Sequence, residues 1–533
     1  MTSITHANMT NAWRRWAARL GLMLLIGQLL VGCASQTIGH PAGPRPEPEH
    51  AQPPSATSRF APLEATIAEK YGPDRSGFNL LERSDRAVLW RLALIDSATQ
   101  SIDLQYYVWF GDTLGRLVMD RVIKAADRGV KVRILFDDLS TMLHDMSHME
   151  LRDALMARID HHPNIHIRVF NPWNDRSLIG RGLDMLSDFP RLNRRMHNKQ
   201  MVVDNRVAII GGRNLAQEYF GLSPEFNFHD LDVIGVGPVA RQASQVFDRY
   251  WNSDWVRPIP KPAEVPGMPV DTELSRSAIE ELMKHPSLVA LGASRTDWSP
   301  QIEELSTLLV PGSSQVHTDS PVRDAKTRNH MPDAIRALIR SAKSELLITN
   351  AYFIPDQHFM ADLQELIGRG VKVRILTNSL ASHDVPAVNA HYEVWREPLL
   401  EAGVDLHELR PDADMRHELA EVAPLQARFI GLHTKSMVID RQRAFIGSMN
   451  LDPRSEVLNS EMGVIVDSPP LAEKLAERMS RDMEGANSWQ VVRGTDGKLV
   501  WRSNAGELST QPVRHFGQRI QNLFFKAFPV ELY

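Results

Sequence analysis

Residues 197–204 read HNKQMVVD, and residues 433–440 read HTKSMVID, 236 positions further along the chain. Both stretches follow the pattern His-x-Lys-x4-Asp, whose members are His197, Lys199 and Asp204 in the first copy and His433, Lys435 and Asp440 in the second. Seven residues after each Asp comes a glycine turn that ends in an asparagine, Asn214 or Asn450. Two imidazoles and two ammonium groups at matched spacing form a set that can cleave a phosphodiester without a metal.

The repeat extends beyond these motifs. Residues 128–135 and residues 369–376 both read RGVKVRIL, with an offset of 241 positions. A self-similar period of this length indicates a duplicated domain rather than a short solenoid unit.

Each RGVKVRIL lies in a predicted strand that follows an earlier strand and a helix. The predicted strand, helix and strand cover residues 102–109, 114–128 and 130–136 in the first half, and 346–352, 358–369 and 371–377 in the second. Further helices are predicted at 86–98 and 331–342. This order implies a parallel strand pair joined by a right-handed crossover. Each motif then falls in a predicted hairpin, 200–210 or 434–446, and this puts its His and Lys on one face of a strand.

One phosphodiester needs a nucleophile and an acid for the leaving oxygen. If the halves pack about a pseudo-twofold axis, one imidazole attacks phosphorus to form a phosphohistidine while the other protonates the departing alkoxide. We expect four side chains to bind the non-bridging phosphate oxygens, namely Lys199, Lys435, Asn214 and Asn450.

Each histidine also needs a partner on its other ring nitrogen. Glu461 and Asp230 hold matching places just before apolar strands in the two halves, so we expect them to orient the histidines. Asp204 and Asp440 belong to the motif but fall at hairpin turns. We expect them to have a structural role, through backbone groups or an arginine. No metal is expected, because lysine is not a usual ligand and soft ligands are absent. No dinucleotide motif is present either.

The net charge is −5, which argues against a strongly basic nucleic-acid binder.

The single cysteine, Cys33, excludes an intramolecular disulfide. It follows three arginines and an apolar run over residues 20–31 and ends the stretch LVGC, which resembles a bacterial lipoprotein signal. We therefore expect residues 1–32 to be a signal peptide and Cys33 to be an acylated membrane anchor; the alternative is a buried first helix. Ala34 after the cysteine indicates, by the same resemblance, a protein that faces the periplasm, at the outer membrane rather than the inner one.

The domain boundaries follow from composition and from the repeat. Residues 33–59 are rich in proline and are expected to be a flexible linker with a reach of roughly 80 Å. The remaining divisions are a first α/β domain at 60–257, a connector at 258–321, a second α/β domain at 322–484, and a C-terminal tail at 485–533 that packs on the body.

Two apolar segments lie outside the motifs. Residues 176–195 interleave apolar residues with arginines and are either a membrane-facing rim or lid ahead of His197, or a core-packed insertion. In the tail, we expect a set of apolar residues to belong to the core: Phe516, Ile520, Leu523, Phe524 and Phe528.

The duplicated motif resembles the signature of the phospholipase D superfamily. Four stretches are most similar to bacterial cardiolipin synthases of the C type: LQYYVW (104–109), GGRNLAQEYFG (211–221), NFHDLDVIGVGP (227–238) and GSMNLDPRS (447–455). The resemblance implies two tandem α/β domains, each a mixed sheet flanked by helices, packed about a pseudo-twofold axis with one shared active site. It also implies transfer of a phosphatidyl group to phosphatidylglycerol, with phosphatidylglycerol or phosphatidylethanolamine as donor. By analogy His197 is the nucleophile and His433 the acid. No cofactor is implied.

Two other functions use the same features. The same residues would serve a phospholipase D-type hydrolase or, less in keeping with the charge, a nuclease. A non-catalytic lipid-binding scaffold is the third hypothesis, and two intact motifs argue against it. The expected partners are phospholipids and a membrane, not nucleic acid.

Overall fold

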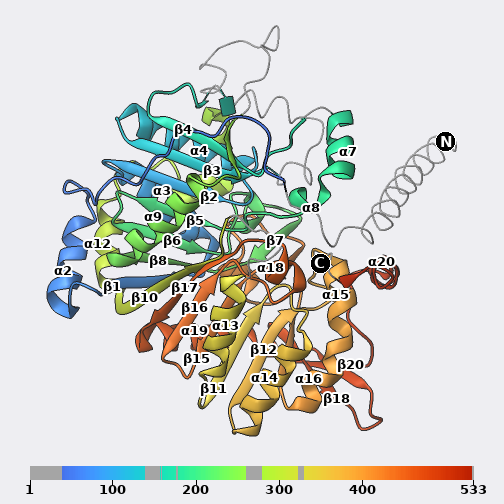
Figure 1. Cartoon of the computed structure of the whole chain (residues 1–533). Helices are drawn as coiled ribbons and strands as arrows, with labels where there is room; N and C mark the ends of the chain where they lie inside the picture. The colour runs from blue at the N-terminus through green and yellow to red at the C-terminus, as the bar shows by residue number, and fades with distance from the viewer. Residues whose placement is uncertain are drawn as a thin grey trace, which may run out of the picture.

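The computed structural model describes residues 39–138, 156–157, 159–175, 178–259, 279–321 and 329–530. The predicted signal peptide and Cys33 lie outside these residues. Within them, eighteen strands form one continuous sheet that crosses both halves of the chain (Figure 1).

The first half of the sheet runs from its outer edge to its centre. The strands in spatial order are β9 (Val256–Pro258), β4 (Ile165–Phe170), β3 (Lys131–Asp137), β2 (Ser101–Tyr106), β5 (Gln200–Val203), β6 (Val207–Gly211), β8 (Asp232–Val236) and β1 (Ser76–Leu81). Strands β2, β3 and β4 are parallel, and the remaining pairs are antiparallel. The strand pair and the hairpin predicted for this half are therefore both present.

The second half repeats this order outward from the centre. Its strands are β10 (Val310–Thr318), β17 (Met462–Asp467), β16 (Arg443–Gly447), β15 (Lys435–Ile439), β11 (Glu345–Asn350), β12 (Lys372–Asn378), β13 (Asp405–Leu409) and β18 (Ser488–Arg493), followed at the edge by β19 (Leu499–Ser503) and β20 (Gly506–Leu508). Strands β1 and β10 pair antiparallel at the middle of the sheet, so the halves meet about a pseudo-twofold axis. The predicted fold class is confirmed.

Helices cover both faces of the sheet. In the first half they are α2 (Ala61–Tyr71), α3 (Ser84–Ser97), α4 (Thr113–Asp127), α7 (Leu178–Ser187), α8 (Phe189–Leu192), η2 (Gln217–Tyr219) and α9 (Pro238–Trp251). In the rest of the chain they are α11 (Pro286–Leu291), α12 (Ser299–Leu308), α13 (His330–Arg340), α14 (Gln357–Gly368), α15 (Pro386–Tyr392), η3 (Glu393–Trp395), α16 (Arg396–Ala402), α17 (Arg416–Leu419), α18 (Pro453–Val457), α19 (Pro469–Asp482) and α20 (Phe516–Phe525).

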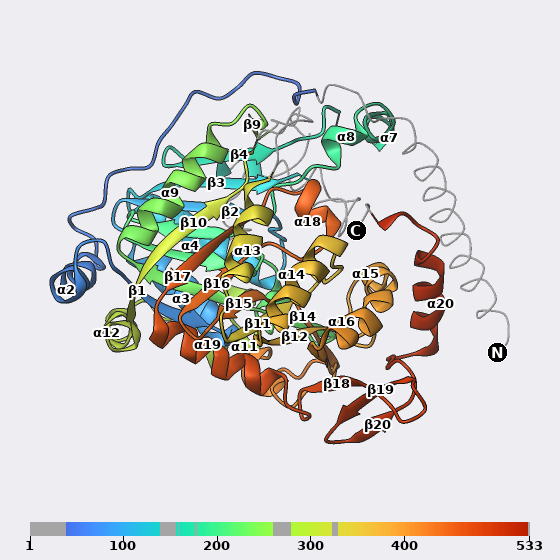
Figure 2. The same cartoon turned by 60° about the horizontal axis from the view of Figure 1, so that its bottom comes forward.

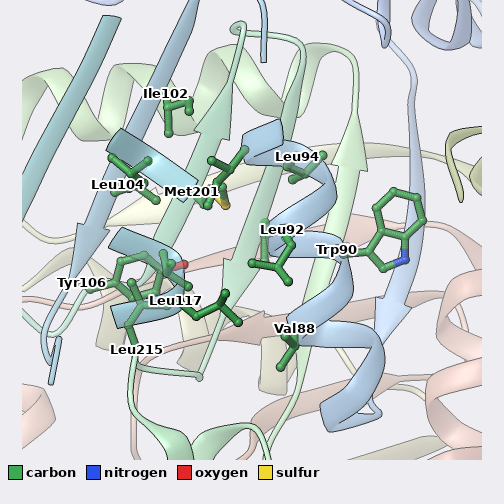
Figure 3. Packing of buried hydrophobic residues seen from close by; sticks show 14 of the residues in the cluster. Val88, Trp90, Leu92, Leu94, Ile102, Leu104, Tyr106, Leu117, Met201 and Leu215 are labelled. Atoms are coloured by element: carbon green, nitrogen blue, oxygen red, sulfur yellow. The ribbon is translucent and has the colours of Figure 1, made fainter. Parts of the chain in front are cut away.

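The RGVKVRIL strands are apolar at successive positions because they are buried on both faces. Ile134 belongs to the core under α3 and α4, which also contains Val88 and Leu92 of α3 and Leu104 of β2 (Figure 3). Its neighbour Leu135 belongs to a second core that contains residues of both halves and the apolar sides of α9 and α19. This shared core joins the halves into one body.

The duplicated unit starts earlier than the sequence suggested. The predicted connector at 258–321 contains α12 and β10, which match α2 and β1 of the first half. Strand β10 was missed because Pro311 and a polar run interrupt the apolar alternation. Pairing with β1 on one side and β17 on the other holds it in the sheet instead.

Residues 41–55, here called the N-terminal strap, lie along the first half. The Glu49 N–H donates to Asn252 Oδ1 at 2.9 Å, and the Ala51 N–H donates to Asp248 Oδ2 at 2.8 Å. Proline keeps this segment extended, and its backbone groups rather than apolar side chains attach it. The expectation of a freely flexible linker is therefore wrong for these residues.

The C-terminal helix α20 has its polar side inward. Gln518 and Asn522 are buried, and Gln518 Nε2 donates to the Leu380 carbonyl oxygen at 2.9 Å. By contrast, Phe516 and Leu523 are 72% and 69% exposed. The predicted core position is wrong for these two residues and for Ile520, while Phe524 and Phe528 are half-buried.

Candidate active site

Each motif histidine lies just before a central strand, β5 or β15, and its backbone is hydrogen-bonded to the other half. The His197 N–H donates to the Ser460 carbonyl oxygen at 2.8 Å, and the His433 N–H donates to the His229 carbonyl oxygen at 2.9 Å. The second contact extends a parallel pair formed by β7 (Phe226–His229) and β14 (Phe429–Leu432). These contacts place each histidine beside the residue that follows its partner in the other half: His197 beside Glu461, and His433 beside Asp230.

Those following residues are the two predicted orienting acids. His197 Nδ1 lies 2.8 Å from Glu461 Oε2, and His433 Nδ1 lies 2.7 Å from Asp230 Oδ2. Both carboxylates are fully buried. Each acid therefore comes from the half that does not carry its histidine. Since Nδ1 is engaged in both rings, Nε2 is the nitrogen left for chemistry.

The two motifs converge on one place. In addition to burial, the ammonium of Lys435 lowers the pKa of His197, and both Lys199 and His197 lower the pKa of His433. Burial is the largest cause in each case; it takes the pKa of His197 to about 4, while Glu461 opposes the shift. His197 is therefore neutral at physiological pH, as a nucleophile must be.

Both lysines are held by the histidine of their own motif. Lys199 Nζ donates to the His197 carbonyl oxygen at 2.6 Å, and Lys435 Nζ donates to the His433 carbonyl oxygen at 2.5 Å. Burial lowers the pKa of Lys199 well below its usual 10.5 and that of Lys435 to about 8, with nearby acids partly opposing the shift. The pair places concentrated positive charge beside the imidazoles, in surroundings where an anion binds strongly.

The two motif asparagines are buried. Asn214 Oδ1 accepts from the Val108 N–H at 3.2 Å. Asn450 Oδ1 is buried without a hydrogen-bond partner among the described residues. Phosphate binding by the two side chains stays a prediction.

Asp204 and Asp440 clamp backbone rather than face the imidazoles. The Asp204 carboxylate accepts from the N–H groups of residues 99–101 at 2.8–3.2 Å, and Asp440 accepts from those of residues 343–345 at 2.7–3.1 Å. These amides begin β2 and β11. Both aspartates adopt a left-handed backbone, with φ of 54° and 53°. These contacts fit the structural role expected for them, with backbone amides as the partners instead of an arginine.

Sequence reasoning missed the aromatic residues around the imidazoles. Tyr107 and Tyr219 each approach a histidine edge-on, His197 and His433 respectively, with ring centroids 5.0 Å apart. Tyr352 is the counterpart of Tyr107, and its hydroxyl donates to Asp384 Oδ2 at 2.6 Å. The sequence signal for both was a tyrosine just past each of two corresponding strands, β2 and β11.

A second missed residue supports Glu461. Ser448, inside the second glycine turn, donates from Oγ to Glu461 Oε2 at 2.5 Å. This contact fixes the same oxygen that accepts from His197.

Within the parts of the chain that the structure describes, no group of three or more His, Cys, Asp or Glu side chains is arranged to hold a metal.

Comparison with known proteins decides the family. The model described as cardiolipin synthase, PLD-like domain, matches residues 92–251 and 335–483, one range for each motif. The chain belongs to this family. The resemblance to the phospholipase D superfamily is thereby confirmed.

Relatives of this cardiolipin synthase family extend over most of the chain. It is 36% identical over 471 residues to cardiolipin synthase C of Escherichia coli (strain K12), which covers 86% of this chain and 96% of that protein. It is 27% identical over 395 residues to the major cardiolipin synthase ClsA of Bacillus subtilis (strain 168), covering 74% of this chain and 66% of that protein. A crystal structure of phosphatidylserine synthase from Haemophilus influenzae covers 80% of this chain and 91% of that one, with a TM-score of 0.53 at 14% identity, a likeness of fold.

Proposed function

We propose that this protein is a phosphatidyltransferase that makes cardiolipin from phosphatidylglycerol and a second phospholipid, either phosphatidylglycerol or phosphatidylethanolamine. The observation that carries the proposal is the pair of buried histidine–carboxylate contacts, each built from both halves, with two lysines beside them. Membership of the cardiolipin synthase family and the 36% identity to cardiolipin synthase C support the choice of substrate.

The proposed reaction has two steps. His197 Nε2 attacks the donor phosphorus, the bond from phosphorus to the headgroup oxygen breaks, and His433 Nε2 gives that oxygen a proton. A phosphatidyl-histidine remains. His433 then takes the proton from a glycerol hydroxyl of the acceptor phosphatidylglycerol. That oxygen attacks phosphorus, the P–N bond breaks, and cardiolipin leaves. Exchange of one phosphodiester for another needs no cofactor.

The charges around His433 fit a general acid that is protonated only when substrate is bound. Burial and then Lys435 and Lys199 lower the pKa of His433 well below its usual 6.5. An anionic phosphodiester between the lysines would offset their charge and raise the pKa of His433. We infer that the lysines, with Asn214 and Asn450, bind the non-bridging oxygens, where charge grows in the transition state.

Product analysis tests this function. Purified enzyme given labelled phosphatidylglycerol should form cardiolipin and release glycerol. Phosphatidic acid as the sole product would mean hydrolysis and contradict transfer. Cleavage of DNA with lipid untouched would contradict both. Loss of turnover in His197→Ala and in His433→Ala would exclude the hypothesis of a non-catalytic lipid-binding scaffold.

We also propose that Cys33 is acylated and that the protein faces the periplasm, at the outer membrane in preference to the inner one. Within the described residues, no helix is long and apolar enough to cross a bilayer. Mass spectrometry of the mature N-terminus and membrane fractionation check both points. An unmodified Cys33 would contradict the anchor.

A further inference from the structure

Two helices pack with their polar side inward and expose an apolar stripe. Within the described residues, eleven large hydrophobic side chains are exposed, and six of them lie on α7 and α20. Those on α7 are Ile179, Leu183 and Leu186, with 79%, 61% and 57% exposed; those on α20 are Phe516, Ile520 and Leu523, with 72%, 55% and 69% exposed. Both sets follow the spacing i, i+4, i+7, which lines them up along one side of a helix.

Polar contacts hold both helices in this orientation. On α7, Asp184 Oδ2 accepts from the backbone N–H of Asn174 at 2.8 Å, and Arg181 is buried. On α20, Asn522 Oδ1 accepts from Asn389 Nδ2 at 2.8 Å. A surface helix normally buries its apolar side, so this arrangement has a cost in water unless another apolar phase covers the stripes.

The two helices lie along the same side of the molecule in both views, and one comes from each half of the chain (Figures 1 and 2). Helix α7 precedes α8 and His197 in the chain. Near the start of α20, Arg514 donates to the carbonyl oxygen of His383, whose ring stacks on Tyr352. The apolar stripes are thus linked to both halves of the catalytic centre.

The N-terminal strap leads to the same side. The Ala42 N–H donates to Asn174 Oδ1 at 2.9 Å, and Asn174 is bonded to α7. Cys33 comes nine residues before Ala42. Nine residues span at most about 30 Å, so an anchor at Cys33 would keep α7 within that distance of a membrane.

We propose that the stripes of α7 and α20 form one docking face that inserts into the interfacial layer of a phospholipid bilayer. The docked protein then takes its lipid substrates from that layer. The occupant is a lipid surface, because the strap follows the proposed anchor in the sequence and its Ala42 is hydrogen-bonded to Asn174, which is bonded to α7. Long apolar side chains at this spacing, on helices that lie in the interface plane, are suited to that layer. The proposal deepens the proposed function and rests on it for the identity of the lipid substrate.

The sole native cysteine allows a direct test. In the acylated full-length mature chain, a cysteine introduced by Leu183→Cys or Leu523→Cys is the one free thiol and takes a polarity-sensitive fluorophore. The labelled protein is reconstituted in vesicles of phosphatidylethanolamine and phosphatidylglycerol with brominated acyl chains. Val289→Cys on α11, which is 64% exposed and belongs to neither stripe, is the matched control.

Blue-shifted emission with bromine quenching is expected at positions 183 and 523 and not at 289. Solvent-like emission without quenching at the two test positions would overturn the proposal. A blue shift that needs no lipid and grows with protein concentration would assign the stripes to a second copy of the chain, which also overturns it.

The catalytic consequence gives a second readout. Leu183→Glu combined with Leu523→Glu should lower turnover of vesicle lipid by roughly tenfold and leave turnover of a monomeric short-chain phosphatidylglycerol unchanged. Equal turnover of both substrates by variant and wild type would contradict docking. Fluorescence needs no turnover, so an enzyme inactive on all lipids whose labels are still quenched would refute the proposed function and leave the docking face standing.

Discussion

Neutralising Glu461 should slow chemistry without unfolding the protein. Its Oε2 accepts from His197 Nδ1 at 2.8 Å and from Ser448 Oγ at 2.5 Å, and the side chain is fully buried. Glu461→Gln keeps the volume but removes the charge, and the new amide can donate to Nδ1 and move the ring proton to Nε2. A hydrogen bond to a charged group contributes about 1.5–3 kcal/mol, so kcat should fall roughly 10- to 150-fold.

The assay is cardiolipin formation at saturating phosphatidylglycerol, with urea unfolding of the same sample. The matched control is Glu408→Gln, which removes another fully buried charge that accepts from Arg396 Nε at 2.6 Å. Glu408 accepts hydrogen bonds from Tyr392, Arg396 and Trp501, none of which belongs to the motifs, so kcat should be unchanged. Loss of its buried charge should lower the unfolding free energy by about 3 kcal/mol. A wild-type kcat in Glu461→Gln would refute the orienting role.

Three further predictions concern other parts of the structure. Burial lowers the pKa of Lys435 to about 8, so its protonated, phosphate-binding form is lost as pH rises through that value. Above pH 8, kcat/KM should therefore fall about tenfold per pH unit. A pH profile that stays flat to pH 10 would contradict this. Asp204→Ala removes the acceptor of three backbone N–H groups and should lower the unfolding free energy in urea by about 2–4 kcal/mol, while Asp204→Asn costs less; an unchanged urea midpoint would refute the clamp. Asp248→Ala frees the Ala51 N–H, so hydrogen exchange at Ala51 should accelerate at least about tenfold by mass spectrometry, and unchanged protection would show that the strap does not depend on this contact.

The sequence predicted most of what is local. Periodicity and the glycine after each helix gave β2, α4 and β3 within a few residues, because these elements bury apolar side chains at regular spacing. The duplicated motif likewise gave the histidines and lysines, and the structure brings them together.

What the sequence did not predict depends on long-range pairing. Strand β10 is held by neighbours on both sides rather than by its own side chains. Glu461 pairs with His197 and Asp230 with His433, each across the two halves. This pairing could be predicted only by knowing which segments of the two halves run side by side. The orientation of α20 is set by its buried polar residues, Gln518 and Asn522. An amphipathic pattern usually predicts that the apolar side of a helix is buried, and here the polar side is buried instead.

The most direct test of a single site shared by both halves is capture of the covalent intermediate. Wild type, His433→Ala and His197→Ala are each mixed with labelled phosphatidylglycerol, quenched in alkaline detergent and mapped by mass spectrometry. We expect a phosphatidyl adduct on His197 that is longer-lived in His433→Ala and absent in His197→Ala. An adduct on His433 would reverse the assigned roles, and an adduct on neither histidine would contradict the mechanism.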